Sequence, residues 1–131
     1  MRRLIYISLV TAGLCDDQMD TLVSTSSRRN HESGITGMLW FNGIHFAQVL
    51  EGDAEAVDAV MRRIVKDQRH TNIEIITDVN DDRRIFGTWG MTLANDGPER
   101  LAMSMLLLGS ARGMPPPHGD RISDIVISSL D

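Results

Sequence analysis

The side chains with the most chemical capability lie on predicted strands, in rows that point to one side. Tyr6, the only tyrosine, and Gln48 fall on two strands, and Trp89 and Met91 fall together on a third. Each of them alone is explained well as a core residue with a satisfied polar tip. Together they indicate a pocket in which a tyrosine O–H contacts a glutamine amide, beside a ligand that has a polar edge and lies between two helices.

Gln48 raises the sharpest question, because it sits in the segment IHFAQVLEG in a row with Ile44, Phe46 and Leu50. Side chains two apart on a strand share a face, so this amide is surrounded by apolar neighbours. A primary amide has two donors and two acceptor lone pairs, and leaving them unpaired in a core costs about 1–3 kcal/mol. We therefore expect Gln48 to have a partner.

Patterns for hydrolysis or metal binding are weak. The four histidines show no metal-ligand spacing, and the serines of the first predicted helix lack a nucleophile-elbow turn. An acidic group is explained by helix capping and first-turn charge; it comprises Glu51, Asp53, Glu55 and Asp58. We therefore expect no metal site and no hydrolytic centre.

The elements that must position these residues follow from apolar spacing. Alternation predicts strands at 3–10, 34–41, 44–50, 73–79 and 85–93, and helical spacing predicts helices at 16–29 and 53–67. Asn42-Gly43 is a signal for a two-residue hairpin turn, and Asp53 is a candidate N-cap. The order βαββαββ predicts a ferredoxin-like α+β sandwich, with one mixed sheet and two helices on one face.

The pattern changes after Leu93. A nearly all-apolar helix is expected at 101–111, then a proline-rich break, and then a segment at 120–130 that reads as a helix, with a strand as the alternative. We divide the chain into a ligand-binding domain at 1–95 and a C-terminal helical extension at 96–131 for output or oligomerisation. The apolar helix is expected to cover the free sheet face or to meet a second copy of the protein.

The composition limits the classes of protein to which this chain can belong. The 131 residues carry a net charge of -5 with a pI near 5.2, which argues against a nucleic-acid surface. Cys15 is the only cysteine, so no intrachain disulfide can form, which fits a reducing cytoplasm. The segment up to Cys15 has the outline of a lipoprotein signal, but Leu14 stands where processing needs a small residue, so a first strand is favoured. No stretch is apolar for long enough to suggest a membrane span.

Five segments together resemble a known family in order and spacing: LIYIS, RRNHESGITGMLWFNG, HFAQVLEG, DQRH and RIFGTWGM. This combination, over about Leu4 to Leu93, is similar to the BLUF domain, a flavin-binding sensor of blue light. The resemblance implies a flavin cofactor, with FAD expected and FMN or riboflavin as alternatives. It also implies that Tyr6 donates an electron and a proton to the excited flavin, and that Gln48 rotates or changes tautomer in response.

The resemblance assigns roles to further positions. Asn30 matches the residue that bonds the pyrimidine edge of the ring, Arg63 and Asp67 match flavin contacts, and His70 matches a residue near the ring. Trp89 and Met91 match the pair that exchanges environment on signalling. Arg29 stands where relatives often have Asn or His, so the contact made from that position is not carried over to this chain.

From the residues themselves, Leu22, Ile35 and Val60 are expected to form the apolar faces of the slot, and Asn30 and Gln48 to supply amides. The resulting hypothesis is a photoreceptor without an enzymatic domain, which signals through a downstream protein partner or its own assembly as a homo-oligomer. One alternative is a ferredoxin-like ligand-binding or oligomeric module without photochemistry. The other is an acylphosphatase-like hydrolase built on Arg28 or Arg29 with Asn30.

Overall fold

A computed structural model describes residues 1–11, 16–84, 92–94, 97–113 and 118–128. The chain forms two compact units, Met1–Leu93 and Ala94–Asp131. Within the described ranges, no helix combines the length and the hydropathy that crossing a bilayer requires.

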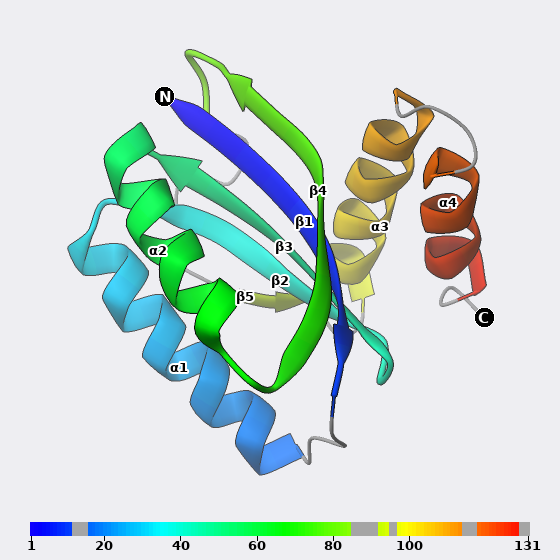
Figure 1. Cartoon of the computed structure of the whole chain (residues 1–131), viewed down its shortest axis with the longest axis horizontal. Coiled ribbons are helices and arrows are strands. Elements are labelled where there is room, and N and C mark those ends of the chain that lie inside the picture. Colours follow the sequence, from blue (N-terminus) through cyan, green and yellow to red (C-terminus); the bar gives the residue numbers. More distant parts are fainter. Residues whose placement is uncertain (12–15, 85–91, 95–96, 114–117, 129–131) are drawn as a thin grey trace. The chain divides into compact units, whose positions relative to one another are not determined.

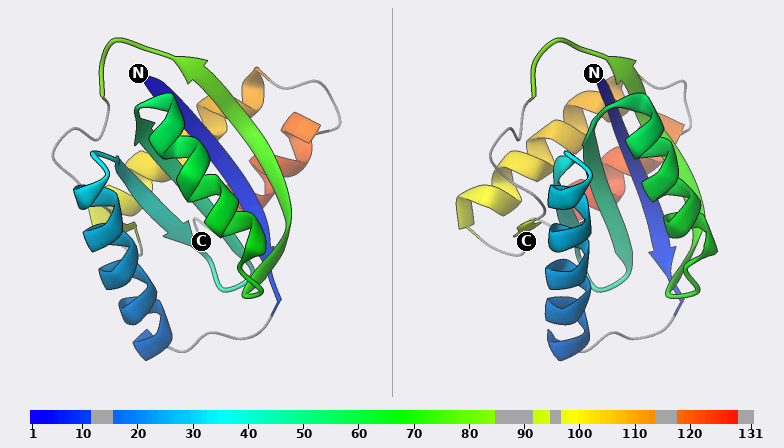
Figure 2. Two further views of the ribbon diagram at one scale, coloured as in Figure 1. Left: turned by 60° about the vertical axis from the view of Figure 1, so that its left-hand side comes forward. Right: turned by 90° about the vertical axis from the view of Figure 1, so that its left-hand side faces the viewer.

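The first unit has the predicted order of elements. It runs β1 (Arg2–Val10), α1 (Asp16–Glu32), β2 (Thr36–Phe41), β3 (His45–Gly52), α2 (Ala54–Lys66), β4 (His70–Asn80) and β5 (Thr92–Ala94), whose last residue falls in the second unit. The strands form one sheet in the order β4-β1-β3-β2-β5, and α1 and α2 lie side by side on one face of it (Figures 1 and 2). The ferredoxin-like α+β fold is confirmed. The pairings β1–β3, β1–β4 and β2–β3 are all antiparallel, so these four strands do not form the mixed sheet that was predicted.

The register of the central strands decides which side chains meet. β1 pairs with β3 in antiparallel fashion and places Tyr6 opposite Gln48, while β2 places Leu39 opposite Gln48 from the other side. The helix-facing rows pack into one core under α1 and α2, comprising Leu4, Tyr6, Ile35, Leu39, Phe46, Leu50, Val57 and Val60. Tyr6 and Gln48 are thus neighbours in a buried layer.

The β2–β3 hairpin differs from the prediction by one residue. Asn42 N–H donates to the His45 carbonyl, so Gly43 and Ile44 are the two turn residues. Gly43 has φ +93°, and glycine at the first turn position is what a type II′ hairpin prefers. The Asn42 side chain accepts from the N–H groups of Ile44 and His45. Ile44, predicted to be in the strand, is therefore exposed in the turn.

Two helix ends also differ from the sequence expectation. α1 continues to Glu32, three residues beyond the predicted end, and so carries Asn30 in its last turn. Asp53 is the N-cap of α2, but its side chain makes no capping hydrogen bond; its carbonyl accepts the first helical bond from Val57 N–H. The N-cap position is confirmed, and the cap is formed by the backbone of Asp53 and not by its side chain.

The second unit holds two helices, α3 (Gly97–Arg112) and α4 (His118–Ser128), which pack against each other. Met103, Leu107, Ile122 and Val126 are fully buried. The segment 118–128 is a helix, so the alternative of a strand there is wrong. Most of the strand predicted at 85–93 lies outside the described residues, and only Thr92 and Leu93 of it appear within β5.

Candidate functional site

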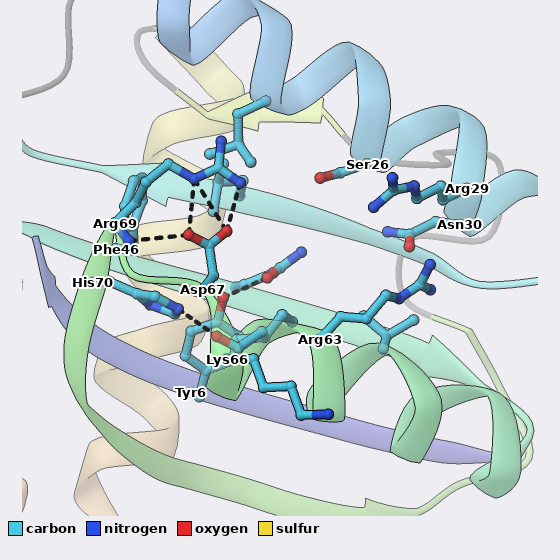
Figure 3. Close-up of a pocket in the computed structure, with 15 residues that line it drawn as sticks. Tyr6, Ser26, Arg29, Asn30, Phe46, Arg63, Lys66, Asp67, Arg69 and His70 are labelled. Atoms are coloured by element: carbon cyan, nitrogen blue, oxygen red, sulfur yellow. Dashed lines mark hydrogen bonds and ion pairs between the residues drawn. The ribbon is translucent and has the colours of Figure 1, made fainter.

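A cavity of about 640 Å³ lies in the first unit between α1, α2 and the sheet (Figure 3). This volume is within the usual range for small-molecule and cofactor pockets. The sheet contributes Tyr6, Leu39, Phe46 and Gln48; the helices contribute Leu22, Ser26, Arg29, Asn30, Val60, Arg63, Ile64 and Lys66; and the start of β4 and the turn before it contribute Asp67, Arg69 and His70. The lining therefore combines apolar side chains with polar and charged ones.

Tyr6 and Gln48 are joined by a short, buried hydrogen bond at the sheet side of this pocket. The Tyr6 hydroxyl donates to Gln48 Oε1 at 2.5 Å, and both side chains are buried. Burial, with a smaller effect from the charge of Asp67, raises the pKa of Tyr6 well above its ordinary value. The phenol is therefore neutral across the physiological range, and its proton points at the amide oxygen.

His70 is fixed by two contacts that determine its neutral tautomer. Its Nε2 lies 2.8 Å from the Ile64 carbonyl, which can only accept, so Nε2 carries the hydrogen. Its Nδ1 then accepts from the Ser8 hydroxyl at 2.7 Å. The ring is 6.2 Å from the Tyr6 ring, between centroids. His70 thus ties β1, β4 and the end of α2 together beside Tyr6.

Asp67 and Arg69 form an ion pair at the end of the pocket where α2 meets β4 (Figure 3). Arg69 Nη2 lies 2.5 Å from Asp67 Oδ2, and Arg69 Nε donates to the same carboxylate. The Arg69 hydrogen bonds hold the pKa of Asp67 below its usual value. The helix predicted at 53–67 ends at Lys66, so Asp67 is the C-cap of α2 and is not on the helix with Arg63. Both side chains nevertheless line the same cavity.

Asn30 offers a buried donor with no partner. The residue is 2% exposed, lines the pocket, and its Nδ2 makes no hydrogen bond within the part of the chain that the structure describes. An unpaired buried amide hydrogen is unfavourable by about 1–3 kcal/mol, so such a group points to an absent acceptor. The pyrimidine edge of a flavin carries carbonyl oxygens that fit this donor.

Three cationic side chains also line the cavity: Arg29 from α1, and Arg63 and Lys66 from α2. None of them forms an ion pair with any residue described in the structure. Arg29 and Asn30 face Arg63 across the pocket (Figure 3). Guanidinium and ammonium groups of this kind suit phosphate oxygens.

This one cavity is lined by six of the residues predicted from the sequence: Tyr6, Asn30, Gln48, Arg63, Asp67 and His70. Leu22 and Val60 also line it, whereas Ile35 packs into the core instead. Trp89 and Met91 lie outside the described residues. Arg28, Arg29 and Asn30 form the end of a helix and not a phosphate-cradling loop, which removes the geometric basis of the hydrolase alternative.

Several contributors were not predicted, including five that line the cavity: Ser26, Leu39, Phe46, Ile64 and Lys66. Ser8 was not predicted either, and its bond to His70 depends on β4 pairing with β1. Arg69 lies in the DQRH segment, where an aspartate two residues before an arginine at a helix end signals a local ion pair.

The family model described as sensors of blue light using FAD matches residues 1–92, which is most of the chain. The chain belongs to the BLUF family. The fold, the pocket between two helices and the Tyr6–Gln48 bond agree with a BLUF domain, the flavin-using module of this family of blue-light photoreceptors.

Relatives of this BLUF chain include the blue light- and temperature-regulated antirepressor BluF of Escherichia coli (strain K12), 44% identical over 91 residues, or 69% of this chain and 22% of that protein. The photoactivated adenylate cyclase subunit beta of Euglena gracilis is 34% identical over 95 residues, 71% of this chain and 11% of that protein. Among solved structures, BlrB, a BLUF protein in its dark state, has a TM-score of 0.69 and 30% identity, with 99% of this chain and 96% of that chain covered.

These matches differ in what surrounds the BLUF domain. The chain spans about a fifth of the Escherichia coli protein and about a tenth of the Euglena cyclase subunit, so those proteins carry other regions that this chain does not match. BlrB has nearly the same extent as this chain. The similarity to the cyclase is confined to the sensor domain and does not make this chain an enzyme.

Proposed function

We propose that this chain senses blue light through a flavin bound between α1 and α2, with Tyr6 and Gln48 as the photoactive pair. The observation that carries the proposal is the 2.5 Å bond between these side chains at the wall of a cavity that also holds an unpartnered amide donor. Asn30 would bond the pyrimidine edge. Asp67 and His70 would line the rest of the ring site, and Arg63 would contact the flavin on the side of its phosphates.

The cavity favours a flavin nucleotide, and we propose FAD. Leu22, Leu39 and Val60 would contact the faces of the ring, while the unpaired cations Arg29 and Arg63 would meet phosphate oxygens. Riboflavin has no phosphate and would leave these charges without a partner. The expected order of affinity is therefore FAD or FMN above riboflavin, measured by titration of the flavin-free protein at two salt concentrations.

When bound, a flavin supplies a chromophore that absorbs blue light and accepts an electron once excited. Tyr6 is the donor that this pocket offers, because it is the only tyrosine or tryptophan among the described residues that line the cavity. A phenol that has lost an electron becomes a strong acid, and the acceptor on its hydroxyl is Gln48 Oε1. The proton therefore has one direct route, into the amide of Gln48.

Movement of that proton changes what Gln48 can donate and accept. A glutamine that has been protonated on its oxygen, or has rotated, presents a different pattern to its neighbours until Tyr6 recovers its proton. Rearranging one buried hydrogen bond is worth about 1 kcal/mol, which biases a two-state element without driving a large change by itself. A larger structural response therefore needs an element of the protein that already has two conformations of similar free energy.

We propose that the extension at 96–131 supplies this response, through a protein partner or through assembly of the chain as a homo-oligomer. In support, α3 and α4 bury a common apolar seam, while Met105 and Ile127 are 63% and 54% exposed. The cytoplasm is the proposed location, since the one cysteine requires no oxidising compartment. Chromatographic sizing in the dark and under blue light measures the change in assembly.

Tyr6→Phe tests the photochemical role. The purified wild-type protein is expected to be yellow and to shift its flavin absorption under blue light. The variant should still bind flavin, because the phenylalanine keeps the aromatic ring of Tyr6. It should show no light-induced shift of the flavin absorption. A normal shift in Tyr6→Phe would remove Tyr6 from the mechanism, and a colourless wild-type protein that takes up no added flavin would end the proposal.

A further inference from the structure

A network of charged and polar groups lies on the sheet face opposite the pocket, at the end where β1 begins and β3 ends. Glu51 is fully buried; its Oε2 accepts from Arg3 Nε at 3.1 Å, and its Oε1 accepts from the Thr36 hydroxyl at 3.1 Å. Arg3 and Thr36 both stand opposite Glu51, in the β1–β3 and β2–β3 registers. This cluster fastens the ends of three strands together.

The residues that follow β4 are attached to this cluster. Arg3 Nη1 donates to Asp81 Oδ2 at 3.0 Å, and Arg3 Nη2 donates to the Arg83 carbonyl at 2.7 Å. Asp81 N–H also donates to the Met1 carbonyl at 2.8 Å. The segment 81–84 is therefore held against the start of β1 by these hydrogen bonds, although Asp82, Arg83 and Arg84 are exposed.

Arg84 extends the attachment toward helix α1. Its Nη1 donates to the Thr36 hydroxyl at 2.9 Å and to the Glu51 carbonyl at 3.1 Å, and its Nη2 donates to the Gly34 carbonyl at 2.9 Å. A planar guanidinium can reach three acceptors in fixed directions, which an ammonium group cannot do in the same way. Arg84 thus links the strand ends to the turn between α1 and β2.

That turn is continuous with the wall of the pocket. Ile35 N–H donates to the Asn30 carbonyl at 2.8 Å, and Gly34 N–H donates to the His31 carbonyl at 3.2 Å. Gly34 has φ +71°, and a Cβ placed on Gly52 would lie 3.2 Å from the Gly34 carbonyl oxygen. The turn is therefore bonded to the residue with the unpartnered amide on one side and to Arg84 on the other.

We infer that Arg84 is a positioning residue for the flavin pocket, which holds the α1–β2 turn so that Asn30 presents its amide, and which couples flavin binding to segment 81–84. The inference rests on the proposed function for the identity of the ligand. Such coupling acts in both directions: flavin binding makes 81–84 more rigid, and loss of the Arg84 contacts weakens flavin binding.

The experiment combines hydrogen exchange, read by mass spectrometry, with flavin titration of Arg84→Ala, Arg84→Lys and the control Arg83→Ala. Arg83 is the matched control because the charge change is the same and the residue enters the network through its backbone carbonyl. In Arg84→Ala, peptides covering 30–36 should exchange faster with and without FAD. The dissociation constant for FAD should rise about threefold to tenfold, the range expected for losing about one net hydrogen bond of positioning.

Further outcomes complete the test. FAD should slow exchange at 81–84 in the wild type and in Arg83→Ala but not in Arg84→Ala, and Arg84→Lys should recover part of the affinity. Equal affinity losses in Arg83→Ala and Arg84→Ala, or a loss with unchanged exchange at 30–36, would overturn the inference. Arg84→Gln serves in place of Arg84→Ala if the latter does not fold. A wild-type protein that binds no flavin defeats the proposed function, while exchange at 30–36 in the flavin-free variants still tests the Arg84 contact.

Discussion

At the scale of single residues, the site depends on two polar groups in an apolar surrounding. Tyr6 is satisfied by Gln48, whereas the Asn30 amide hydrogen has no acceptor among the described residues. Under the proposed function, the Tyr6 hydroxyl would pass its proton toward Gln48, and the Asn30 amide would donate to an oxygen of the ligand. Both statements lead to measurements on the flavin-free protein.

Asn30→Leu should separate stability from binding. Leucine has the same branching and number of side-chain heavy atoms as asparagine, and it removes the unpaired donor. The cavity has room for its larger methyl groups, so the flavin-free protein should keep its stability or gain up to about 1 kcal/mol. Flavin affinity should fall about tenfold or more, because the ring loses a hydrogen bond. Denaturant unfolding and flavin titration measure the two effects, and Asn30→Asp, which keeps the shape and loses the donor, is the control. A large loss of stability without flavin would mean that Asn30 has a structural partner.

Alkaline titration should show that Tyr6 stays protonated. Burial raises its pKa in the folded protein, while in the unfolded chain the pKa is about 10. The resulting stabilisation is present below about pH 10 and is lost as the pH rises further, because only the unfolded chain then ionises. The chain has one tyrosine, so the phenolate absorbance of the flavin-free protein reports this residue alone. The absorbance should appear together with unfolding; its appearance in the folded protein near pH 10 would be contradictory.

At the scale of elements, close contact between β2 and β3 positions Gln48 in the sheet. A Cβ on Gly37 would lie 1.9 Å from the Val49 carbonyl oxygen, a backbone atom that cannot move without breaking the ladder. Leu39, two residues along β2, stands opposite Gln48. The glycine therefore permits the strand spacing on which the pocket wall depends.

Gly37→Ala should destabilise the first unit by about 3 kcal/mol or more, since the clash involves backbone. Gly109→Ala is the matched control: it lies in α3, its Cβ would meet nothing within 4 Å, and replacing a helical glycine by alanine stabilises by about 0.5–1 kcal/mol. Thermal unfolding followed by circular dichroism compares them. Equal behaviour of the two variants would contradict the steric account.

At the scale of the whole molecule, ion pairs connect elements that are distant in sequence. Arg2 bonds Asp58 on α2 and Asp78 on β4. Arg69, in contrast, bonds Asp67 only two residues away, beside the pocket. The hydrogen bond from Arg2 holds the pKa of Asp78 below its usual value, and the hydrogen bond from Arg69 does the same for Asp67. Acid should therefore lower the free energy of unfolding, because these carboxylates become protonated and lose their ion pairs.

Stability should fall as the pH is lowered. A depressed carboxyl pKa in the folded state contributes stability above the unfolded value of about 4, and this contribution is lost as the pH falls toward the folded value. Each group contributes less than about 1 kcal/mol, because both side chains are partly exposed. Urea unfolding at pH 6 and pH 3 should show the loss, and Asp78→Asn should reduce it. A free energy of unfolding that increases as the pH is lowered from 6 to 3 would contradict the role given to these carboxyl groups.

Local patterns were sufficient to predict the order of elements and much of the site. Alternating apolar residues specify strands, helical spacing specifies α2, and the Asn42-Gly43 signal specifies a hairpin, because each depends on neighbours along the chain. The placement of Tyr6 and Gln48 on inward rows followed from the same alternation. The one-residue error in the hairpin arose because both Asn42 and Gly43 suit turns, and only the closing bond to His45 shows which residues occupy it.

Contacts between remote segments required the fold. Tyr6 meets Gln48, Ser8 meets His70 and Arg3 meets Glu51 at separations of 42, 62 and 48 residues. Each pairing depends on strand order and register, and a slip of one residue would turn the side chains to the other face. The unpartnered amide of Asn30 and the reach of Arg84 to the α1–β2 turn likewise exist only after the helices and strands have packed, because burial and hydrogen-bond partners are properties of the assembled layers.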